Sequence, residues 1–322
     1  MKGMRDVNRA SMIFGLWAAA LLGGAPTGLC AAQNDTSLGA QAAPFLTWPV
    51  DARTAALGSA GVASVNDVDA PGINPAGLAE AKGVQLDLNQ DFLYLGTNLE
   101  SASASWSPMR KAALGVTATY LSAGTVDRSI IDPSGAIQTT GSFNPYYYVA
   151  GLSYAQETLA GLDVGATLKL VGDSIDTWDS QACAVDLGAQ AATPVHGLRF
   201  GASLLNLGTT LGGANLPLTG RVGGTYKMPF FGHRNSLALS VDAQIPTAAA
   251  GQTTLCGGLE LHYGRFLSLR GGYESGDYGG VTGLTNITAG AGFGMNWWQV
   301  DYAWIPEGDL GDAQQFSLSA KF

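Results

Sequence analysis

A histidine beside a carboxylate is the arrangement in this chain that could do acid–base chemistry. His262 follows Glu260 by two residues in the stretch LELHY, and this spacing puts both side chains on one face of a strand. Such a pair can activate a serine hydroxyl for nucleophilic attack. The other histidines, His196 and His233, fall in predicted turns, and no G-x-S-x-G stretch accompanies any of the three. We therefore expect an interior histidine paired with its carboxylate, and no enzyme.

Two further stretches have the residue types of binding loops but not their spacing. In GAGFG, residues 290–294, the glycines alternate along a predicted strand instead of leading into a helix, so close packing is a better interpretation than phosphate binding. The acids of PEGDLGD, residues 306–312, lack the ligand spacing of a known Ca²⁺ loop and indicate a solvated loop. Cys183 and Cys256 would face opposite sides of one sheet, which excludes a disulfide between them. The sequence predicts no metal site and no cofactor.

Alternation of apolar and polar residues, about ten residues at a time, organises the chain from residue 84 onward. In QQFSLSAKF, residues 314–322, every second residue from Phe316 to Phe322 is apolar and those between are polar. One apolar and one polar face per strand is the signature of a transmembrane β-barrel. The predicted strands are 84–93, 97–106, 112–121, 144–156, 162–171, 181–191, 198–207, 220–227, 236–244, 253–263, 267–273, 286–295, 297–305 and 314–322. The predicted fold class is all-β, a 14-stranded antiparallel transmembrane barrel.

The connections and the aromatic residues favour a barrel that spans a membrane. Connections after even-numbered strands are mostly short, and those after odd-numbered strands are mostly longer, as at 122–143, 172–180 and 208–219. Bacterial outer-membrane barrels alternate short periplasmic turns with long external loops in this way. Aromatic residues gather near strand ends on the apolar phase, as in the two aromatic belts of a spanning barrel. A soluble β-domain, the alternative, has no reason to keep either pattern.

Charged residues on the polar phase of the strands predict an occupied interior. Acids and bases occur there in similar numbers, and a near-neutral mixture indicates paired charges rather than an ion filter of one sign. The expected lumen charges are Lys169, Asp186, Arg221, Asp242, Glu260, Arg270 and Asp301. Glu100 is an exception because it shares a phase with the apolar residues of its strand. No obvious apolar stripe is visible on the lumen phase.

The first 32 residues have the composition of a secretory signal peptide. Lys2, Arg5 and Arg9 form a basic start, an apolar run follows at 12–22, and Cys30-Ala31-Ala32 supplies small residues for cleavage. The apolar run is too short for an N-terminal anchor helix, which is the alternative. The leader therefore predicts export.

The charge of the exported chain argues against nucleic acid as a partner. Removing residues 1–32 takes three bases and one acid from the 16 bases and 25 acids of the full chain, and leaves 24 acids, 13 bases and a net charge of −11. An acidic balance repels phosphate backbones. Only 13% of all residues are charged, which is low for a soluble surface and suits a barrel wall that faces lipid.

Residues 33–83 do not alternate, and they predict a plug inside the barrel. The stretch from Asp51 to Ala81 is dense in alanine and glycine, so it is compact enough for a lumen of this size. Asn74 suits the N-cap and Pro75 the first position of a short helix over 76–81. The predicted organisation is a signal peptide at 1–32, a plug at 33–83 and an outer-membrane barrel at 84–322.

The plug also resembles a known family. RTAALGSAGVASVNDVDAPGINPAGLA, residues 53–79, looks like the N-terminal signature of PorV/PorQ-type outer-membrane proteins, a branch of the FadL-like fourteen-stranded barrels. Residues 198–226 and 300–322 look familial as well. The signature positions, and our candidate plug and gating residues, are Arg53, Leu57, Gly58, Asp67, Asp69, Asn74, Pro75, Ala76 and Gly77.

The resemblance implies two possible functions. FadL-like members carry fatty acids or other hydrophobic compounds past the outer membrane. In that mechanism the plug shifts when ligand binds, and the ligand can leave sideways through the wall. PorV-type members are instead accessories of the type IX secretion system that receive substrates at the cell surface.

We expect a protein of the bacterial outer membrane that acts as a gated channel or transporter for small hydrophobic molecules. The alternative is a PorV-like accessory or anchor of a secretion system. The expected partners are outer-membrane lipid, the barrel-assembly machinery, which would read the C-terminal Phe322, and either a hydrophobic small molecule or secretion-system proteins.

Overall fold

The computed structural model describes residues 41–109, 111–159, 161–230, 235–247, 252–264, 266–276 and 281–322. The predicted signal peptide at 1–32, the first part of the predicted plug at 33–40, and His233 lie outside the described residues.

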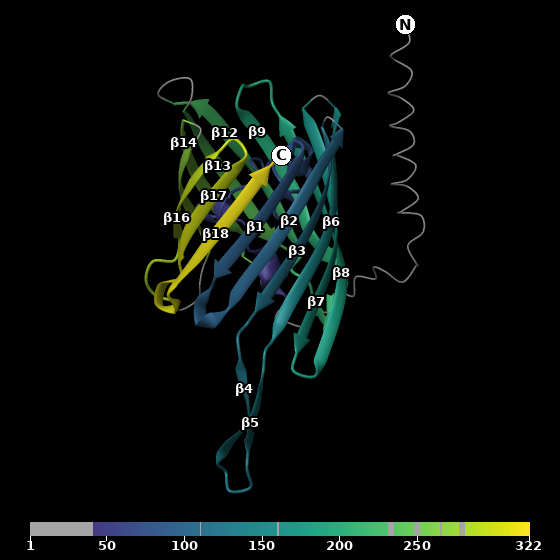
Figure 1. Cartoon of the computed structure of the whole chain (residues 1–322), viewed down its shortest axis with the longest axis vertical. Coiled ribbons are helices and arrows are strands. Elements are labelled where there is room, and N and C mark those ends of the chain that lie inside the picture. The colour runs from purple at the N-terminus through teal and green to yellow at the C-terminus, as the bar shows by residue number, and fades with distance from the viewer. Residues whose placement is uncertain are drawn as a thin grey trace, which may run out of the picture. The chain divides into compact units, whose positions relative to one another are not determined.

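Fourteen antiparallel strands of the described chain close into a barrel, which confirms the predicted fold class (Figure 1). Each strand pairs with its neighbour along the chain, and the last pairs with the first, with Gln85 opposite Lys321. The wall consists of β1 (Val84–Phe92), β2 (Asn98–Met109), β3 (Ala112–Ser122), β6 (Tyr146–Leu159), β7 (Leu162–Ile175), β8 (Trp178–Ala192), β9 (Leu198–Gly208), β12 (Thr219–Pro229), β13 (Ser236–Pro246), β14 (Thr254–Tyr263), β15 (Leu267–Glu274), β16 (Ile287–Met295), β17 (Trp298–Pro306) and β18 (Asp312–Lys321).

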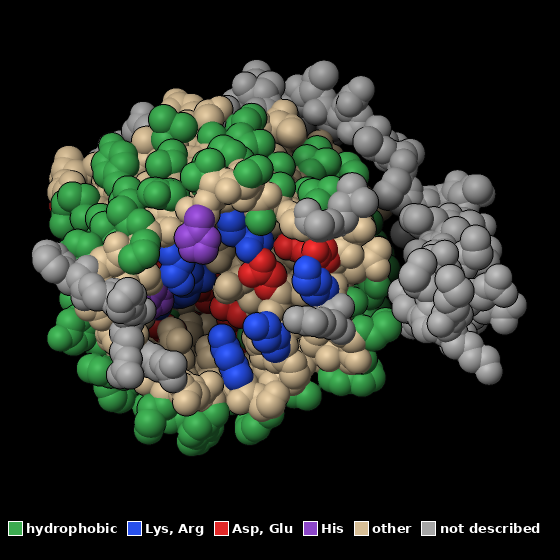
Figure 2. All heavy atoms as spheres, turned by 90° about the horizontal axis from the view of Figure 1, so that it is seen from above, with side chains coloured by type: hydrophobic (Ala, Val, Ile, Leu, Met, Phe, Trp, Pro, Cys, Tyr) green, Lys and Arg blue, Asp and Glu red, His purple; other side chains and the backbone are tan. Residues whose placement is uncertain are grey.

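The alternation of side chains puts polar groups inside the barrel and apolar groups outside. In β1, Asp87 and Asn89 are buried, whereas their neighbours Leu86 and Leu88 are exposed. Figure 2 shows the barrel from above, with hydrophobic side chains around its outside and charged side chains gathered in its mouth. An apolar outer surface around a polar interior suits strands that cross a membrane. No helix of the described chain is long and apolar enough to cross one.

The two ends of the barrel differ in their connections. At the short-turn end, links such as those after β14 and β16 have only a few residues. At the other end, the long-loop end, the predicted loop 122–143 contains a hairpin of β4 (Val126–Ile131) and β5 (Ile137–Phe143), which projects from the barrel (Figure 1). The predicted loop 172–180 is wrong, because β7 and β8 continue through it and leave a turn of two residues. By the rule for bacterial barrels, the long-loop end faces the cell exterior.

Shorter elements complete the long-loop end. They are β10 (Thr210–Leu211), β11 (Ala214–Asn215), η4 (Tyr94–Gly96) and η5 (Gly308–Leu310). The carboxylate of Asp132 organises the tip of the β4–β5 hairpin, since it accepts hydrogen bonds from the backbone N–H groups of Ser134 (2.8 Å) and Ala136 (3.0 Å).

Residues 41–83, here the inner segment, lie within the barrel. They contain η1 (Pro44–Thr47), α2 (Ala52–Ala56), η2 (Ala70–Gly72) and η3 (Pro75–Glu80). The predicted helix at 76–81 is a 3₁₀ helix that begins at Pro75, with the Asn74 side chain accepting from the Ala76 N–H. The α2 helix was not predicted; Asp51 caps it by accepting from the Thr54 N–H at 2.8 Å.

Candidate functional site

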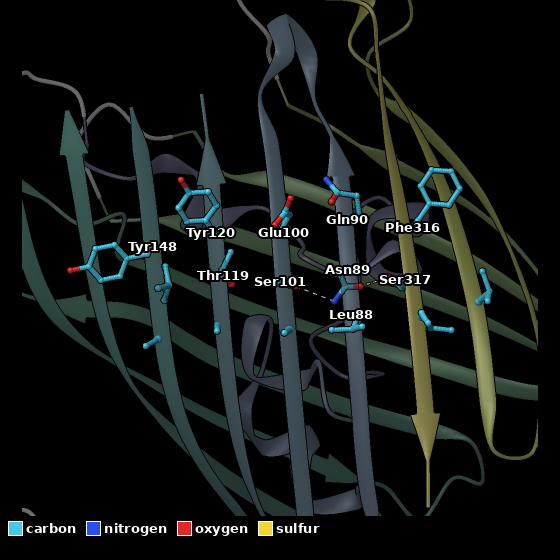
Figure 3. A pocket seen from close by; sticks show the side chains of 16 residues that line it. Leu88, Asn89, Gln90, Glu100, Ser101, Thr119, Tyr120, Tyr148, Phe316 and Ser317 are labelled. Atoms are coloured by element: carbon cyan, nitrogen blue, oxygen red, sulfur yellow. Dashed lines mark hydrogen bonds between the residues drawn. The ribbon is translucent and has the colours of Figure 1, made fainter. Parts of the chain in front are cut away.

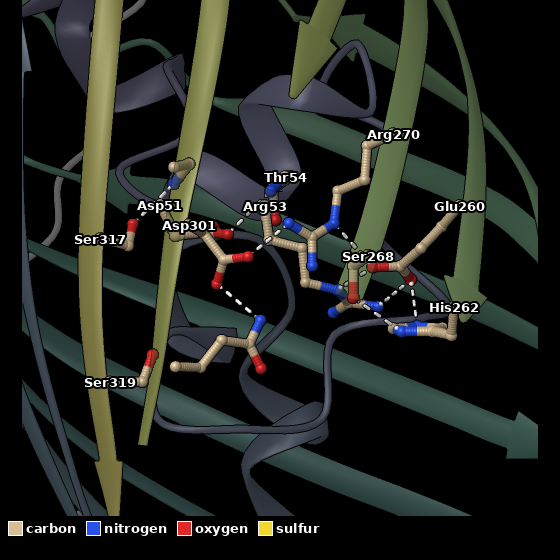
Figure 4. Close-up of polar contacts among 12 residues, drawn as sticks. Asp51, Arg53, Thr54, Glu260, His262, Ser268, Arg270, Asp301, Ser317 and Ser319 are labelled. Atoms are coloured by element: carbon tan, nitrogen blue, oxygen red, sulfur yellow. Dashed lines mark hydrogen bonds and ion pairs between the residues drawn. The ribbon is translucent and has the colours of Figure 1, made fainter. Parts of the chain in front are cut away.

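An ion-pair network joins the inner segment to the wall. Arg53 extends from α2 toward β14 and donates from Nε and Nη2 to the two carboxylate oxygens of Glu260, at 3.0 and 2.9 Å (Figure 4). Arg270 donates to the same carboxylate at 2.8 Å and to Asp301 at 2.5 Å. Glu260 is 3% exposed, so this attraction is little screened by water. The nearby Glu260 carboxylate raises the pKa of Arg53 above its usual range, which keeps the guanidinium charged.

The histidine considered for catalysis belongs to this network. His262 Nε2 lies 3.3 Å from Glu260, and its Nδ1 lies 2.9 Å from the Ser268 hydroxyl. Glu260 is therefore shared among two guanidiniums and an imidazole. The described residues contain no group of three or more His, Cys, Asp or Glu that could hold a metal ion.

A second set of contacts holds the backbone of the inner segment. Asp242 accepts from the N–H groups of Gly61 and Val62 at 2.6 and 2.7 Å. Arg221 donates to the carbonyls of Ser59 (3.2 Å) and Thr47 (3.0 Å). These are charge-assisted bonds to the main chain, so they fix the path of the inner segment whatever its side chains are.

Asn74 is at the centre of a third set of hydrogen bonds between the inner segment and the wall. Besides capping η3, its amide donates to the carbonyls of Val62 (2.7 Å) and Ala189 (3.0 Å). Gln190, which the sequence did not single out, donates to the carbonyls of Val62 and Val65 at 3.1 and 3.0 Å. The buried side-chain amides of Asn74, on the inner segment, and of Gln190, on β8, thus both donate to backbone carbonyls of the same turn.

The other predicted residues have varied surroundings. Leu57 is buried, and the Gly58 N–H donates to Thr288 at 3.0 Å. Lys169 of β7 pairs with Asp186 of β8 at 2.6 Å. At the short-turn end, Phe322 exchanges backbone hydrogen bonds with Val84 of β1. The positions of Pro75, Ala76 and Gly77 are all within η3, and all three are buried.

Carboxylates gather where the inner segment faces β1. Burial raises the pKa of Asp51, and it raises the pKa of Asp69 well above its ordinary range. Asp87, Asp67 and Asp51 add repulsion that raises the pKa of Asp69 further. This side of the lumen is acidic, whereas the side near β14 and β15 has paired charges. The acidic pair of the signature, Asp67 and Asp69, belongs to this side.

An apolar cluster, which the sequence analysis missed, lies in the lumen at the long-loop end. It consists of Ala43, Phe45, Leu99, Leu121, Val149, Val171, Ala182, Ala184, Leu211 and Leu216. Phe45 of η1 is 4% exposed, and its ring centroid lies 5.5 Å from that of Tyr147. The wall supplies one or two apolar residues from each of several strands, so no single strand displays a stripe. Cross-strand pairs, such as Leu99 with Leu121 and Val149 with Val171, bring them together.

A groove of about 890 Å³ lies on the outside of the wall, over β18, β1, β2, β3 and β6 (Figure 3). Small residues pair across its floor: Ala102 with Ala118, and Ala118 with Ala150. Glu100 lies opposite Gln90 and Tyr120, in a row along the groove, and is exposed on the outside of the wall. The exception noted in the sequence therefore marks this groove.

A cavity of about 50 Å³, here the inner cavity, lies on the other side of the same strands, between them and the inner segment. Ser101, Thr119 and Val149 line both the outer groove and the inner cavity. The wall at this point is therefore only one strand layer thick between two recesses.

Comparisons with known proteins identify the fold. No protein-family model and no curated protein matches the chain. Among solved structures, the Ralstonia pickettii toluene transporter TbuX aligns with a TM-score of 0.56 at 15% identity, over 85% of this chain and 98% of TbuX. The Pseudomonas putida toluene transporter TodX aligns with a TM-score of 0.54 at 14% identity, over 83% of this chain and 95% of TodX. A Pseudomonas aeruginosa FadL homologue aligns with a TM-score of 0.51 at 12% identity, over 85% of this chain and 98% of the homologue.

At these identities the likeness shows the fold alone, a closed barrel that this chain shares with TbuX, TodX and the FadL homologue. It agrees with the closed wall of fourteen strands and with its apolar outer surface. The narrower resemblance to the PorV/PorQ branch stays a prediction.

Proposed function

We propose that this protein is a gated outer-membrane channel for small hydrophobic molecules, with the inner segment as its gate. The observation that carries the proposal is the apolar cluster at the long-loop end of the lumen, with Phe45 of the inner segment packed into it. A polar channel needs no such cluster, whereas a hydrophobic molecule that enters from outside needs an apolar surface to leave water. TbuX and TodX, which share the fold, are named toluene transporters.

The back-to-back recesses support a sideways exit through the wall. The inner cavity and the outer groove are separated by β2, β3 and β6, whose outward residues there include Ala102, Ala118 and Ala150. A molecule that left along this route would enter lipid without crossing the polar short-turn end. Small side chains let a hydrophobic molecule approach the strand backbone closely.

Movement of the inner segment is the gating step in this proposal. The segment lies in the lumen and is bonded to the wall. Arg53 of the segment bonds to the wall, and Asp242 and Arg221 of the wall bond to the backbone of the segment. A ligand that binds better when Phe45 has left the apolar cluster would shift the population toward the open arrangement.

A disulfide lock tests the gate. The Ala52 N–H donates to Ser317 Oγ at 2.8 Å, so the two residues are in contact, and a disulfide between cysteines at these positions would tie the inner segment to β18. We would express A52C/S317C, with Cys183 and Cys256 replaced by serine, in cells that lack their own toluene channel, and measure uptake of radiolabelled toluene. Oxidised cells are expected to take up toluene at the rate of cells without the protein, and reduction should restore uptake.

The same assay separates the possible failures. Equal uptake in oxidised and reduced cells would show that the inner segment is not the gate. No uptake in either state, with a folded barrel in the membrane, would reject the channel for this class of molecule.

A surface-anchor role, similar to that of secretion accessories, is the second proposal. It rests on the β4–β5 hairpin, where Ile131 and Ile137 are 75% and 76% exposed beyond the barrel, and on Trp178, which is 79% exposed at the same end. Exposed apolar side chains at an outer tip suit a protein partner. Deleting residues 126–143 should leave toluene uptake intact, and an anchor role requires that it abolish recovery of surface partners with the barrel.

A further inference from the structure

We propose that the inner cavity binds the hydroxyl group of small aromatic alcohols of the phenol type, with Asp69 as the residue that recognises the hydroxyl. The inference rests on the proposed function, because the ligand reaches this cavity only if the barrel admits small hydrophobic molecules. It narrows the substrate class from plain hydrocarbons to hydroxylated aromatic compounds.

The inner cavity has two chemically different sides. The inner segment supplies Phe45, Trp48 and Val50, which are apolar. The wall supplies hydroxyl groups from β2, β3 and β7, namely Ser101, Ser103, Thr117, Thr119 and Thr167. Thr167 and Ser101 already pair with Ser153 (2.8 Å) and Asn89 (3.1 Å), but a hydrocarbon would offer no partner to the Asp69 carboxyl, which also lines the cavity. A ring that carries a hydroxyl matches both sides.

Asp69 is the polar group of this cavity that most needs a partner. The residue is 8% exposed, and its Oδ1 atom has no hydrogen-bond partner among the described residues. Its side chain makes no capping bond to η2, although it stands at the N-cap of that helix. A buried carboxyl oxygen left unpaired destabilises the protein, so a donor that reaches it is favoured.

The surroundings of Asp69 favour a neutral ligand over a cation. Lys169 lines the same cavity, but its ammonium group pairs with Asp186 at 2.6 Å and with Asn206 at 3.0 Å. Burial and the neighbouring acids raise the pKa of Asp69 well above its ordinary range, which favours the protonated, neutral form of the carboxyl. A neutral carboxyl offers one O–H donor and one C=O acceptor, and a phenolic hydroxyl can pair with both.

Space for the aromatic ring lies beside the inner cavity. About 50 Å³ is enough for a polar group but not for a whole ring. Phe45 lines the cavity and also fills the apolar cluster. When the inner segment shifts, the ring of the ligand takes the place of the Phe45 ring, and its hydroxyl points to Asp69.

Two probes of nearly equal size test the inference. We would measure the binding of p-cresol and of toluene to the refolded full-length barrel by calorimetry. One hydrogen bond to a buried group is worth about 1–1.5 kcal/mol, so wild-type protein should bind p-cresol about tenfold tighter than toluene. Partition of the probes into detergent is the same for every variant and cancels in their comparison.

Substitutions of Asp69 assign the preference to this residue. D69A should reduce the preference for p-cresol to about onefold, because no hydrogen-bonding group remains. D69N should keep most of it, because a neutral amide has the same shape and also offers a donor and an acceptor. D132A, which changes the exposed carboxylate at the hairpin tip, is the matched control and should bind both probes as the wild type does.

The outcomes separate this inference from the function on which it rests. If the wild type binds neither probe, both are overturned. Equal binding of the two probes by the wild type, or a preference that D69A leaves unchanged, overturns the hydroxyl site and leaves the hydrocarbon channel standing. If D69A does not fold, D69L, which keeps the branched shape of the side chain and removes its hydrogen-bonding atoms, takes its place in this comparison with the same expected result.

Discussion

Glu260 illustrates how one side chain can hold two parts of this molecule together. It bonds to Arg53 of the inner segment and to Arg270 of β15, and it lies beside His262. Removing one partner of a buried ion pair costs about 3–5 kcal/mol, because the remaining charge is left in a poorly solvating place. The loss of stability should be largest where the most charges are left unpaired. Removing the Glu260 charge should therefore destabilise the closed arrangement more than removing the Arg53 charge.

We predict that E260Q opens the inner segment more than R53M does. E260Q leaves two guanidiniums facing a neutral amide, whereas R53M leaves Glu260 with Arg270 and His262. The measurement is the rate at which a cysteine at Ala52, which is fully buried, reacts with a water-soluble maleimide in a chain whose native cysteines are serines. The expected order of rates is E260Q, then R53M, then the parent. Equal rates in all three would show that this ion pair does not hold the gate.

Alternation in the sequence indicates which strand residues face inward, but it does not indicate their partners. Glu260 and Arg270 share the inward phase of two predicted strands, yet only the register of β14 on β15 places them opposite each other. Arg53 comes from a segment with no period, so its partner could not be read from the sequence. For the same reason the apolar cluster was missed, since it is assembled from single residues near the ends of separate strands.

At the scale of elements, the seat of η3 depends on wall residues without side chains. A Cβ on Gly165 of β7 would collide with the backbone of Pro75 and Ala76, and one on Gly188 of β8 would collide with the Asn74 amide oxygen. The short helix therefore lies directly on the strand backbone. A methyl group at either position has no room unless the helix moves.

We predict that G188A and G165A each displace η3, at a cost of about 1–3 kcal/mol, which is typical of overpacking. Hydrogen exchange of the peptide that covers residues 70–83 should become faster in both variants. G257A is the matched control, because a Cβ there meets nothing within 4 Å. Unchanged exchange in G188A and G165A would contradict direct seating of η3 on the wall.

The strands were predictable and the hairpin was not, for one physical reason. A strand that separates lipid from a polar lumen must alternate, so its pattern is visible in the sequence. The β4–β5 hairpin projects beyond the barrel and is exposed on both faces, so nothing requires Val126–Ile131 to alternate. The stretch Ala52–Ala56 is buried on nearly all sides, and its alanines give no helical period either.

At the scale of the whole molecule, the lumen has one side with paired charges and one side with crowded acids. Asp51 and Asp69 of the inner segment face Asp67 and Asp87, and Arg53, which lies near Asp51, is committed to Glu260. Burial raises the pKa of Asp51 and of Asp69, so the closed arrangement holds protons that a solvated carboxyl would release. Opening of the inner segment is therefore linked to proton release.

The sign of this linkage gives the last prediction. Below about pH 4 the carboxyls are protonated in both arrangements, so the closed state keeps its full stability. As the pH rises toward the raised pKa values, the carboxyls of the open state lose their protons first. The ratio of open to closed protein then rises, by up to about tenfold per pH unit for each proton released. Single-channel recordings of the refolded protein should show more frequent openings as the pH is raised above about 4. D69N should flatten this dependence, whereas D132N should not, because hydrogen bonds at the hairpin tip lower the pKa of Asp132 to about 2 and keep it ionised throughout. Openings that become rarer as the pH rises would contradict this origin of the gate's stability.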